Sequence, residues 1–410
     1  MGQYGQFGLL WIWHCAPLFF GVGVAMVFAC LIISLYYNIF AAYSLVYFAR
    51  CFNRILPWTL CSDFSSNEED NCLPYWWYIS SNVTTSSKEY FYKIVLNTSF
   101  TPESSIGSLK WWLLLSLLFS WVIVYIVTLR SCRSIGKFAI VMVIFCYFAI
   151  LTLLVVAFQV KSTGRLVAHG TENESIFNLR MWCSAIMQVL LELGIYLGIP
   201  VVYGSYCRFR HFILIDSLIL CIINYINSII FFYLFFSFAK SFSCNVAHLP
   251  WHIPDTTIGV IYMIYSESFS TISGQHYWCL IFFLMLFLIV LGTQIAIAEA
   301  IMTAVYDNVM KLSQHRWLIN LLICSVLCFL GIIFCLTNGY FTSLLLYYIP
   351  VLFIIVPLSC LFVIGIVLVY GFGQYSQNMK TMGDYNFGTV TRLFLYSLII
   401  ILFLIFTKSV

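Results

Sequence analysis

Charged side chains are scarce in this 410-residue sequence, and their scarcity excludes a soluble fold. Only 8% of the residues are charged, whereas 62% are hydrophobic and the mean hydropathy is +0.98. A soluble domain needs far more polar side chains to cover its water-facing surface. The formal net charge of +4 lies on loops and implies no nucleic-acid partner. The composition therefore predicts a polytopic membrane protein.

Catalytic signatures are lacking as well. The sequence shows no Ser/His/Asp constellation, no phosphate-binding loop and no cluster of metal ligands with typical spacing. An enzyme is therefore not expected. The short alternating segments of a transmembrane β-barrel are also lacking, which leaves helices as the spanning elements.

Long apolar runs dominate the sequence instead. Each is about 20 residues or longer, which is enough to cross a hydrocarbon core of about 30 Å. The nine runs lie near 18–49, 111–129, 137–160, 182–206, 213–239, 278–304, 317–336, 343–371 and 390–407. We therefore expect an all-α polytopic membrane protein with about nine transmembrane helices. We expect the whole chain, 1–410, to form one transmembrane domain with a large extracellular loop at 50–110.

Basic loops and glycosylation sequons predict the orientation of the chain. Short loops rich in Lys and Arg alternate with the others and are expected in the cytoplasm, together with the N-terminus. These basic loops lie near 130–137, 208–210, 311–316 and 380. The N-glycosylation patterns, which require the opposite side, are at Asn82, Asn97 and Asn173. The two signals agree, and we expect an integral protein of the plasma membrane.

Two of the 16 cysteines indicate a covalent link. Cys61 and Cys72 lie close together in the large loop expected in the oxidising exterior, so we expect a disulfide between them. The alternative is metal binding by this pair, but no His or Cys cluster accompanies it. Most other cysteines lie inside apolar runs, where cysteine is usually a small packing residue.

Several short motifs follow one another along the chain. They are Gly2-Gln3-Tyr4 with Gly21-Val22-Gly23, Tyr36-Tyr37-Asn38, Leu56-Pro57-Trp58, Ser134-Ile135-Gly136-Lys137 and Leu193-Gly194. In this order and spacing they resemble the neurotransmitter:sodium symporter family, the carriers of amino acids and monoamines. The resemblance implies a partial inverted-repeat fold, in which broken helices hold substrate and ions near the membrane midplane.

The resemblance also implies which helices are present. The chain matches the family's third to eleventh helices and lacks the first, most of the second and the twelfth. In the family, the first helix gives ligands to both sodium ions and to the substrate. We therefore expect this chain alone to be inactive as a transporter.

By the same resemblance, five residues are candidates for the substrate site. Ile33 and Tyr37 match the wall that the third helix provides, and Gly194 matches the break in the sixth helix. Leu191 and Leu197 occupy positions that the family commonly gives to phenylalanine. A packed, hydrogen-bonded core tyrosine remains the alternative for Tyr37.

The resemblance assigns ion ligands as well. Asn224 matches a first-sodium ligand, and Thr293 keeps a hydroxyl where the family has a serine ligand for the second sodium. Gln188 and Ser228 match chloride ligands. Glu192 stands where the family has Ser or Thr, so we expect a carboxylate to take the anion's place and make the protein chloride-independent. The alternative is a neutral, hydrogen-bonded glutamic acid in a degenerate site.

The spacing of these residues adds an argument of its own. Gln188 and Glu192 are four apart on one helix, as are Asn224 and Ser228 on the next. Each pair therefore lies on one helix face, and the two faces could meet.

Two functions follow. The first is a sodium-coupled symporter of amino acid or amine-like solutes, with the sodium ion as cofactor and a small-molecule solute and membrane lipid as partners. The second is a non-transporting membrane scaffold or regulatory partner of the same family, which would bind a carrier or a second copy of itself. Leu197, and Gly292 where many animal members have Asp, favour the second.

Overall fold

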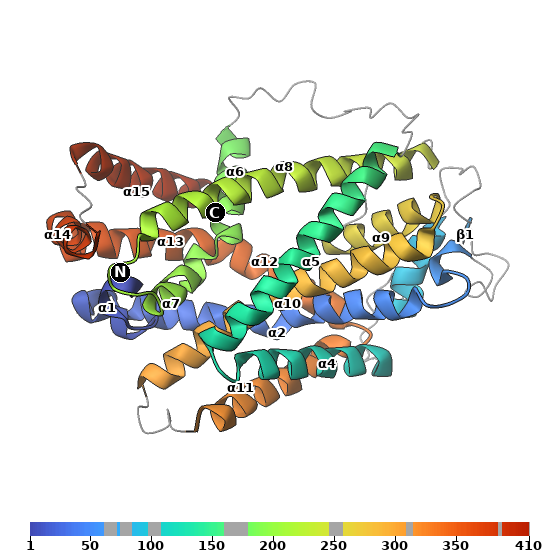
Figure 1. The fold of residues 1–410 in the computed structure, drawn as a ribbon, viewed down its shortest axis with the longest axis horizontal. Helices are drawn as coiled ribbons and strands as arrows, with labels where there is room; N and C mark the ends of the chain where they lie inside the picture. The colour runs from blue at the N-terminus through green and yellow to red at the C-terminus, as the bar shows by residue number, and fades with distance from the viewer. Residues whose placement is uncertain are drawn as a thin grey trace.

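The computed structural model describes eight segments of the chain, and almost all of them are helical (Figure 1). The described residues are 1–60, 72–73, 84–96, 108–159, 179–245, 257–308, 315–383 and 388–409. The α-helices are α1 (Gly2–Gly5), α2 (Phe20–Arg50), α3 (Ser86–Glu89), α4 (Trp111–Thr128), α5 (Cys132–Gln159), α6 (Leu179–Glu192), α7 (Ile199–Ser205), α8 (Ile213–Asn245), α9 (Thr257–Ser270), α10 (Gln275–Asn308), α11 (Arg316–Gly331), α12 (Gly339–Phe353), α13 (Ile355–Ile364), α14 (Phe372–Gly383) and α15 (Thr389–Ser409).

Short segments connect these helices. The 3₁₀ turns are η1 (Trp11–Cys15), η2 (Pro17–Phe19), η3 (Pro57–Thr59), η5 (Ile195–Leu197) and η7 (Ile332–Cys335), and the π-helical segments are η4 (Tyr90–Leu96) and η8 (Gly365–Gly371). Strands β1 (Cys72–Leu73) and β2 (Thr84–Thr85) pair in parallel over two residues each. The expectation of an all-α fold is confirmed, since this pair is the whole of the sheet in the described chain.

Seven helical stretches of the described chain are long and apolar enough to cross a membrane. They are 17–50, 111–128, 132–158, 213–239, 275–308, 316–335 and 355–383. The expected number of about nine is not reached by this criterion. The apolar run at 182–206 is divided between α6, η5 and α7, and the run at 390–407 lies in α15, whose apolar stretch is shorter.

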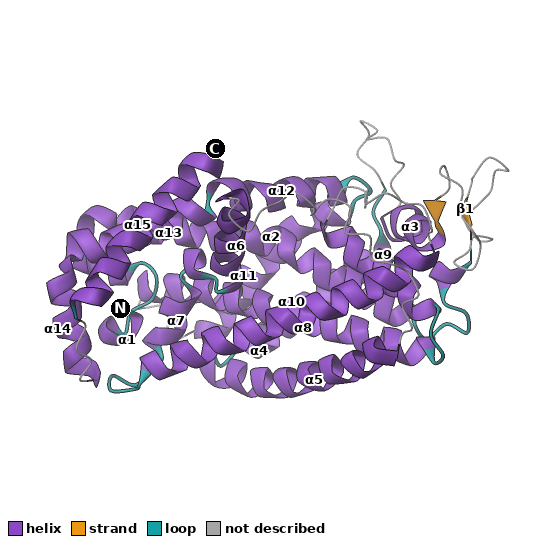
Figure 2. Ribbon diagram, turned by 90° about the horizontal axis from the view of Figure 1, so that it is seen from above, coloured by secondary structure: helices purple, strands orange, loops and turns teal. Residues whose placement is uncertain are grey.

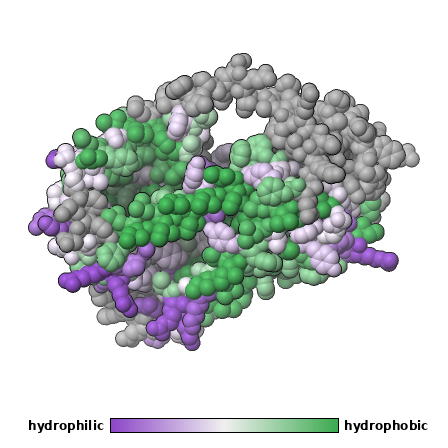
Figure 3. Space-filling model, turned by 45° about the horizontal axis from the view of Figure 1, so that its top comes forward, coloured by the Kyte–Doolittle hydropathy of each residue, from purple (hydrophilic) through white to green (hydrophobic). Residues whose placement is uncertain are grey.

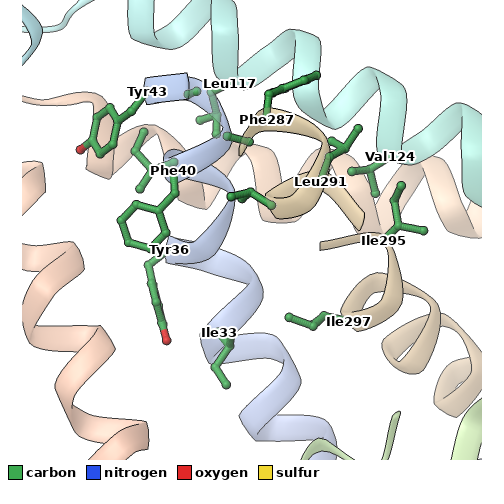
Figure 4. Packing of buried hydrophobic residues seen from close by; sticks show 14 of the residues in the cluster. Ile33, Tyr36, Phe40, Tyr43, Leu117, Val124, Phe287, Leu291, Ile295 and Ile297 are labelled. Atoms are coloured by element: carbon green, nitrogen blue, oxygen red, sulfur yellow. The ribbon is translucent and has the colours of Figure 1, made fainter. Parts of the chain in front are cut away.

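Helices α2 and α10 form the centre of the fold and run antiparallel. Gln294 Nε2 donates to Ser34 Oγ over 2.7 Å, whereas the rings of Tyr47 and Phe283 lie 4.8 Å apart toward the other end. Residue numbers therefore rise along α2 as they fall along α10. Figure 4 shows apolar side chains of α4 (Leu117 and Val124) and of α10 (Phe287, Leu291 and Ile295) gathered on one side of α2. Both helices are apolar on all sides, because one part of each packs against other helices and the remainder belongs to the apolar surface of the bundle.

The remaining helices surround this pair (Figure 2). Helices α4, α11 and α12 pack against α2, α5 packs against α10, and α13 contacts α15. The space-filling view shows a broad apolar surface over the helices and polar side chains gathered toward the ends (Figure 3). Such a band is what a lipid-facing surface requires, because hydrocarbon offers no partner for polar groups.

The expected extracellular loop contributes ordered structure at one end of the α2–α10 pair, which we call the outer end. There η3, α3 and η4 pack against α9. Ser86 Oγ donates to the carbonyl of Trp58 over 2.8 Å, and Ser87 Oγ donates to the carboxylate of Glu267. Part of the loop therefore packs onto the helices through buried hydrogen bonds.

Several predictions fall outside the described residues. Cys61 and the three sequon residues Asn82, Asn97 and Asn173 belong to this group. The Cys61–Cys72 disulfide and the glycosylation accordingly stay predictions.

Candidate functional site

The break between α6 and α7 is the first part of the candidate site. Helix α6 ends at Glu192, and α7 begins at Ile199. Between them Gly194 and Gly198 adopt left-handed backbone angles, with φ of 60° and 66°. Residues with a Cβ are strained in this conformation, which is why glycine stands at both places. The break that the resemblance implied at Gly194 is present.

The broken segment packs against α2. Leu197 and Ile33 are both buried, and the Cys30 thiol donates to the carbonyl of Leu197 over 3.5 Å. A Cβ on Gly198 would lie only 2.1 Å from Leu9 Cδ2, so the backbone approaches its neighbours closely here. The structure thus brings the expected residues Ile33, Gly194 and Leu197 into one neighbourhood, while Leu191 is partly buried at the end of α6.

Tyr37 and Thr293 join α2 to α10 within the same region. Their side chains are hydrogen-bonded to each other, and the Thr293 hydroxyl also donates to the carbonyl of Ile289 over 3.3 Å. Tyr37 is only partly buried, so it is not a fully enclosed core tyrosine. The bond places a candidate substrate residue beside a candidate sodium ligand.

Glu192 is the centre of a second polar group between α6 and α8. Gln188 Nε2 donates to one carboxylate oxygen over 2.9 Å, and Asn224 Nδ2 donates to the other over 3.0 Å. Ser228 Oγ donates to the backbone carbonyl of Asn224 over 3.0 Å and does not bond to Glu192. The two helix faces therefore meet, and the carboxylate of Glu192 is the group that joins them.

This second group is open on one side. Gln188, Glu192 and Ser228 are exposed in the described chain, and Asn224 is partly exposed. Only 6% of the apolar stretch of α8 is buried, the lowest share among the seven spanning helices. The carboxylate is therefore held by two amides but is accessible to an ion, to water or to another segment.

The two candidate sodium positions differ in how well they suit a hard cation, which binds several oxygen atoms. At the first, the carboxylate of Glu192 and the side-chain amide of Asn224 supply oxygens within one hydrogen-bonded group. At the second, Thr293 and Tyr37 supply hydroxyls, but Gly292 has no side chain. A Cβ on Gly292 would lie 2.9 Å from the thioether of Met142, so an apolar group occupies that place. The first set of residues fits sodium, and the second does not.

A further polar network lies at the end of α10 opposite the outer end. Glu299 is buried and accepts hydrogen bonds from Ser131 Oγ and from Tyr206 Oη, the latter over 2.9 Å. Thr303 Oγ1 lies 3.3 Å from the same tyrosine hydroxyl. Both partners of Glu299 are far from it in the sequence, Ser131 by 168 residues and Tyr206 by 93. The network joins α10 to the start of α5 and the end of α7.

Two neighbouring contacts were not predicted from the sequence. Asp307 accepts a hydrogen bond from the backbone N–H of Gly8 over 2.7 Å. Gln3 Nε2 lies within 3.1 Å of the carbonyls of Arg208, Phe209 and His211. An acidic residue at the end of an apolar run, such as Asp307, was the available signal. Together these contacts fix the first residues of the chain to α10 and to the α7–α8 turn.

Comparison with known proteins gives a consistent result. The model of the family described as "Sodium:neurotransmitter symporter family" matches residues 1–410. The chain is 26% identical over 405 residues to the sodium- and chloride-dependent glycine transporter 1 of Xenopus laevis, covering 93% of this chain and 64% of that protein.

Two further relatives show similar values. The sodium- and chloride-dependent neutral and basic amino acid transporter B(0+) of Mus musculus is 25% identical over 424 residues, covering 93% of this chain and 65% of that protein. The sodium-dependent nutrient amino acid transporter 1 of Drosophila persimilis is 25% identical over 406 residues, covering 93% and 61%. The chain thus spans a little under two thirds of the length of these relatives.

The family match and the apolar helices agree on the class of protein. The family comprises sodium-coupled transporters of the plasma membrane and not enzymes, and the seven apolar stretches fit an integral membrane protein. The chain belongs to the sodium:neurotransmitter symporter family.

Proposed function

We propose that the protein acts in sodium-coupled symport of an amino-acid-like solute. The observation that carries this proposal is the glycine-bounded break between α6 and α7, which packs against α2 beside the Tyr37–Thr293 bond. Backbone groups freed by a helix break can receive the charged ends of a solute. The names of the relatives, which specify glycine and other amino acids, favour amino acids over amines.

In this proposal, sodium is held by the first set of residues. The carboxylate of Glu192 and the amide oxygen of Asn224 are its side-chain ligands, and Gln188 fixes the orientation of the carboxylate. A bound sodium ion supplies positive charge and couples the solute to the sodium gradient. Thr293 then does not bind sodium but orients the Tyr37 hydroxyl toward the solute.

Glu192 also makes the proposed symport independent of chloride. A carboxylate carries a permanent negative charge between α6 and α8, where the resemblance places the chloride of other members. The side-chain amides of Gln188 and Asn224 already donate hydrogen bonds to the Glu192 carboxylate. A chloride ion beside this carboxylate would be repelled by its negative charge. Chloride would bind only after the carboxylate is removed or neutralised.

Uptake measurements test both statements. The protein encoded by the full-length transcript is expressed in cells with low endogenous transport, and uptake of labelled amino acids is compared in sodium and in choline. We expect sodium-dependent uptake that is unchanged when gluconate replaces chloride, and uptake by Glu192→Ser that requires chloride. Chloride dependence of the unaltered protein would refute the role given to Glu192.

A non-transporting partner is the second candidate function. The packing of Met142 against Gly292 favours it, because Gly292 contributes no side-chain oxygen to a second sodium site. The expected result in that case is a protein that reaches the cell surface, shows no sodium-dependent uptake of any amino acid, and co-purifies with an active carrier. Uptake by the surface-expressed protein decides between the two functions.

A further inference from the structure

Two cysteines from distant parts of the sequence meet at the outer end of the central helix pair. Cys51 follows the last residue of α2, and its N–H donates to the carbonyl of Tyr47 over 3.1 Å. Cys279 lies in the second turn of α10. His276 Nε2 lies 3.1 Å from the carbonyl of Asn53, which shows that the two helix ends adjoin. The antiparallel course of α2 and α10 brings these ends together.

The two cysteines occupy matching positions of the antiparallel pair. The rings of Tyr47 and Phe283 lie 4.8 Å apart, and Cys51 is four residues after Tyr47 while Cys279 is four residues before Phe283, so both lie one helical turn nearer the outer end. The two side chains interact there, and Cys51 Sγ lies 3.2 Å from the carbonyl of Tyr47. Exposure is 1% for Cys51 and 0% for Cys279. The Tyr47 and Phe283 rings, 4.8 Å apart, and Trp58 pack over the same helix ends. This contact differs from the usual place of a buried cysteine among aliphatic side chains.

We propose that Cys51 and Cys279 form a disulfide that joins the outer ends of α2 and α10. The antiparallel register places the two cysteines opposite each other, which is the arrangement that a disulfide of about 2.05 Å requires. The chain continues from Cys51 directly into the loop that carries the sequons, and the sequons place this end in the oxidising compartment. The disulfide is additional to the one expected between Cys61 and Cys72.

The bond forms by two successive thiol–disulfide exchanges with a protein disulfide of the secretory compartment. One thiolate attacks the donor disulfide and gives a mixed disulfide, and the second thiolate then displaces the donor's cysteine. Two protons leave the protein, and two electrons pass to the donor, which becomes a dithiol. Because both sulfurs are enclosed in the folded chain, exchange takes place before Trp58 and Phe283 pack over them.

The helices that would be linked carry the candidate site. Tyr37 lies on α2 and Thr293 on α10, and their bond depends on the two helices keeping their register. A covalent link at one end limits sliding between the helices and closes a very long loop in the unfolded chain. We therefore expect reduction to lower thermal stability and to loosen this region.

Peptide mapping tests the link directly. The protein is purified in the presence of N-ethylmaleimide, denatured, digested without reductant and analysed by mass spectrometry. We expect a Cys51 peptide linked to a Cys279 peptide that separates on adding dithiothreitol. Recovery of both cysteines as maleimide adducts, or of Cys279 linked to a different cysteine, overturns the proposal.

Thermal unfolding supplies a second readout with a matched control. Dithiothreitol is expected to lower the Tm of the unaltered protein by about 5 °C or more beyond the shift that it causes in Cys51→Ser with Cys279→Ser, where only the expected Cys61–Cys72 disulfide is left to reduce. Cys335→Ala is the control, because Cys335 is equally buried and its carbonyl accepts from the N–H of Lys110 at the same end. The proposal fails if dithiothreitol shifts the double variant as much as the control.

Discussion

At the scale of single residues, Glu267 shows how a buried acid outside the spanning helices affects stability. It lies on α9, is 2% exposed and accepts a hydrogen bond from Ser87. Burial raises its pKa from 4.5 to about 7, although hydrogen bonds from Ser87 and Thr85 act in the opposite direction. The folded protein therefore holds a proton on Glu267 at a pH where the unfolded chain has released it.

The sign of the pH dependence follows from linkage. The stabilising contribution is fully present below pH 4.5 and is lost as the pH rises through about 7, on the order of 3 kcal/mol in total. Glu267→Gln removes this titration, so we expect its Tm to fall less between pH 5 and pH 7.5 than that of the unaltered protein. Differential scanning fluorimetry in detergent measures both curves.

Thr59→Val is the control for this prediction. Thr59 lies at the same end, is also buried and donates to the carbonyl of Leu56 over 2.7 Å, but its side chain has no group that titrates. Its replacement is expected to lower the Tm while leaving the slope with pH as it was. Equal slopes for Glu267→Gln and the unaltered protein would show that Glu267 does not titrate in this range.

The sequence anticipated such residues only in part. Glu267 and Glu299 are acids in apolar stretches of the sequence, and both are buried and hydrogen-bonded. Their partners were not predictable, because Ser87 and Ser131 are hydroxyls from segments far away in the chain. The hydrophobic periodicity and the composition of a segment predict its secondary structure, but they carry little information about which segments pack together.

At the scale of elements, the α6–α7 break depends on two glycines with different surroundings. A Cβ on Gly198 would lie 2.1 Å from Leu9 Cδ2 and 3.2 Å from Met26 Sδ, whereas a Cβ on Gly194 would lie 3.2 Å from the flexible end of Ile199. Both have positive φ. Packing therefore adds to backbone strain at Gly198 and adds little at Gly194.

We expect Gly198→Ala to destabilise the protein by about 2 kcal/mol or more, and Gly194→Ala by about 1 kcal/mol. Gly21→Ala serves as the control, since Gly21 is helical and nothing lies within 4 Å of its Cβ position. That change is expected to be neutral or to stabilise slightly. Thermal unfolding of the three variants under one condition measures the order of their stabilities. Equal Tm values for Gly198→Ala and Gly21→Ala would contradict the expected order.

Elements were predicted better than their interruptions. Each expected apolar run lies over helical residues, because a membrane span has a strong and local signal. The interruption at Gly194 was expected only from the family resemblance, and the division of 343–371 into α12, α13 and η8 was not expected. Apolar composition is the same on both sides of such a break, so hydropathy does not detect it.

At the scale of the whole molecule, the two ends of the helix bundle differ in chemistry. One end carries the first residues of the chain, the Glu299 network and exposed basic side chains such as Arg133 and Arg210. The other end carries η3, α3 and α9, which contain aromatic and hydroxyl side chains. Excess Lys and Arg mark the cytoplasmic side of a membrane protein. The first end is therefore expected inside the cell and the second outside.

Cysteine accessibility tests this orientation. Cys15 is exposed beside the inner end of α2, and Ser273 is exposed in the turn between α9 and α10. A membrane-impermeant maleimide is expected to label Ser273→Cys in intact cells, but to label Cys15 only after the membrane is permeabilised. Cys15→Ser identifies the Cys15 signal in the second experiment. If Cys15 is labelled in intact cells to the same extent as after permeabilisation, the assigned orientation is inverted, and with it the oxidising environment proposed for Cys51 and Cys279.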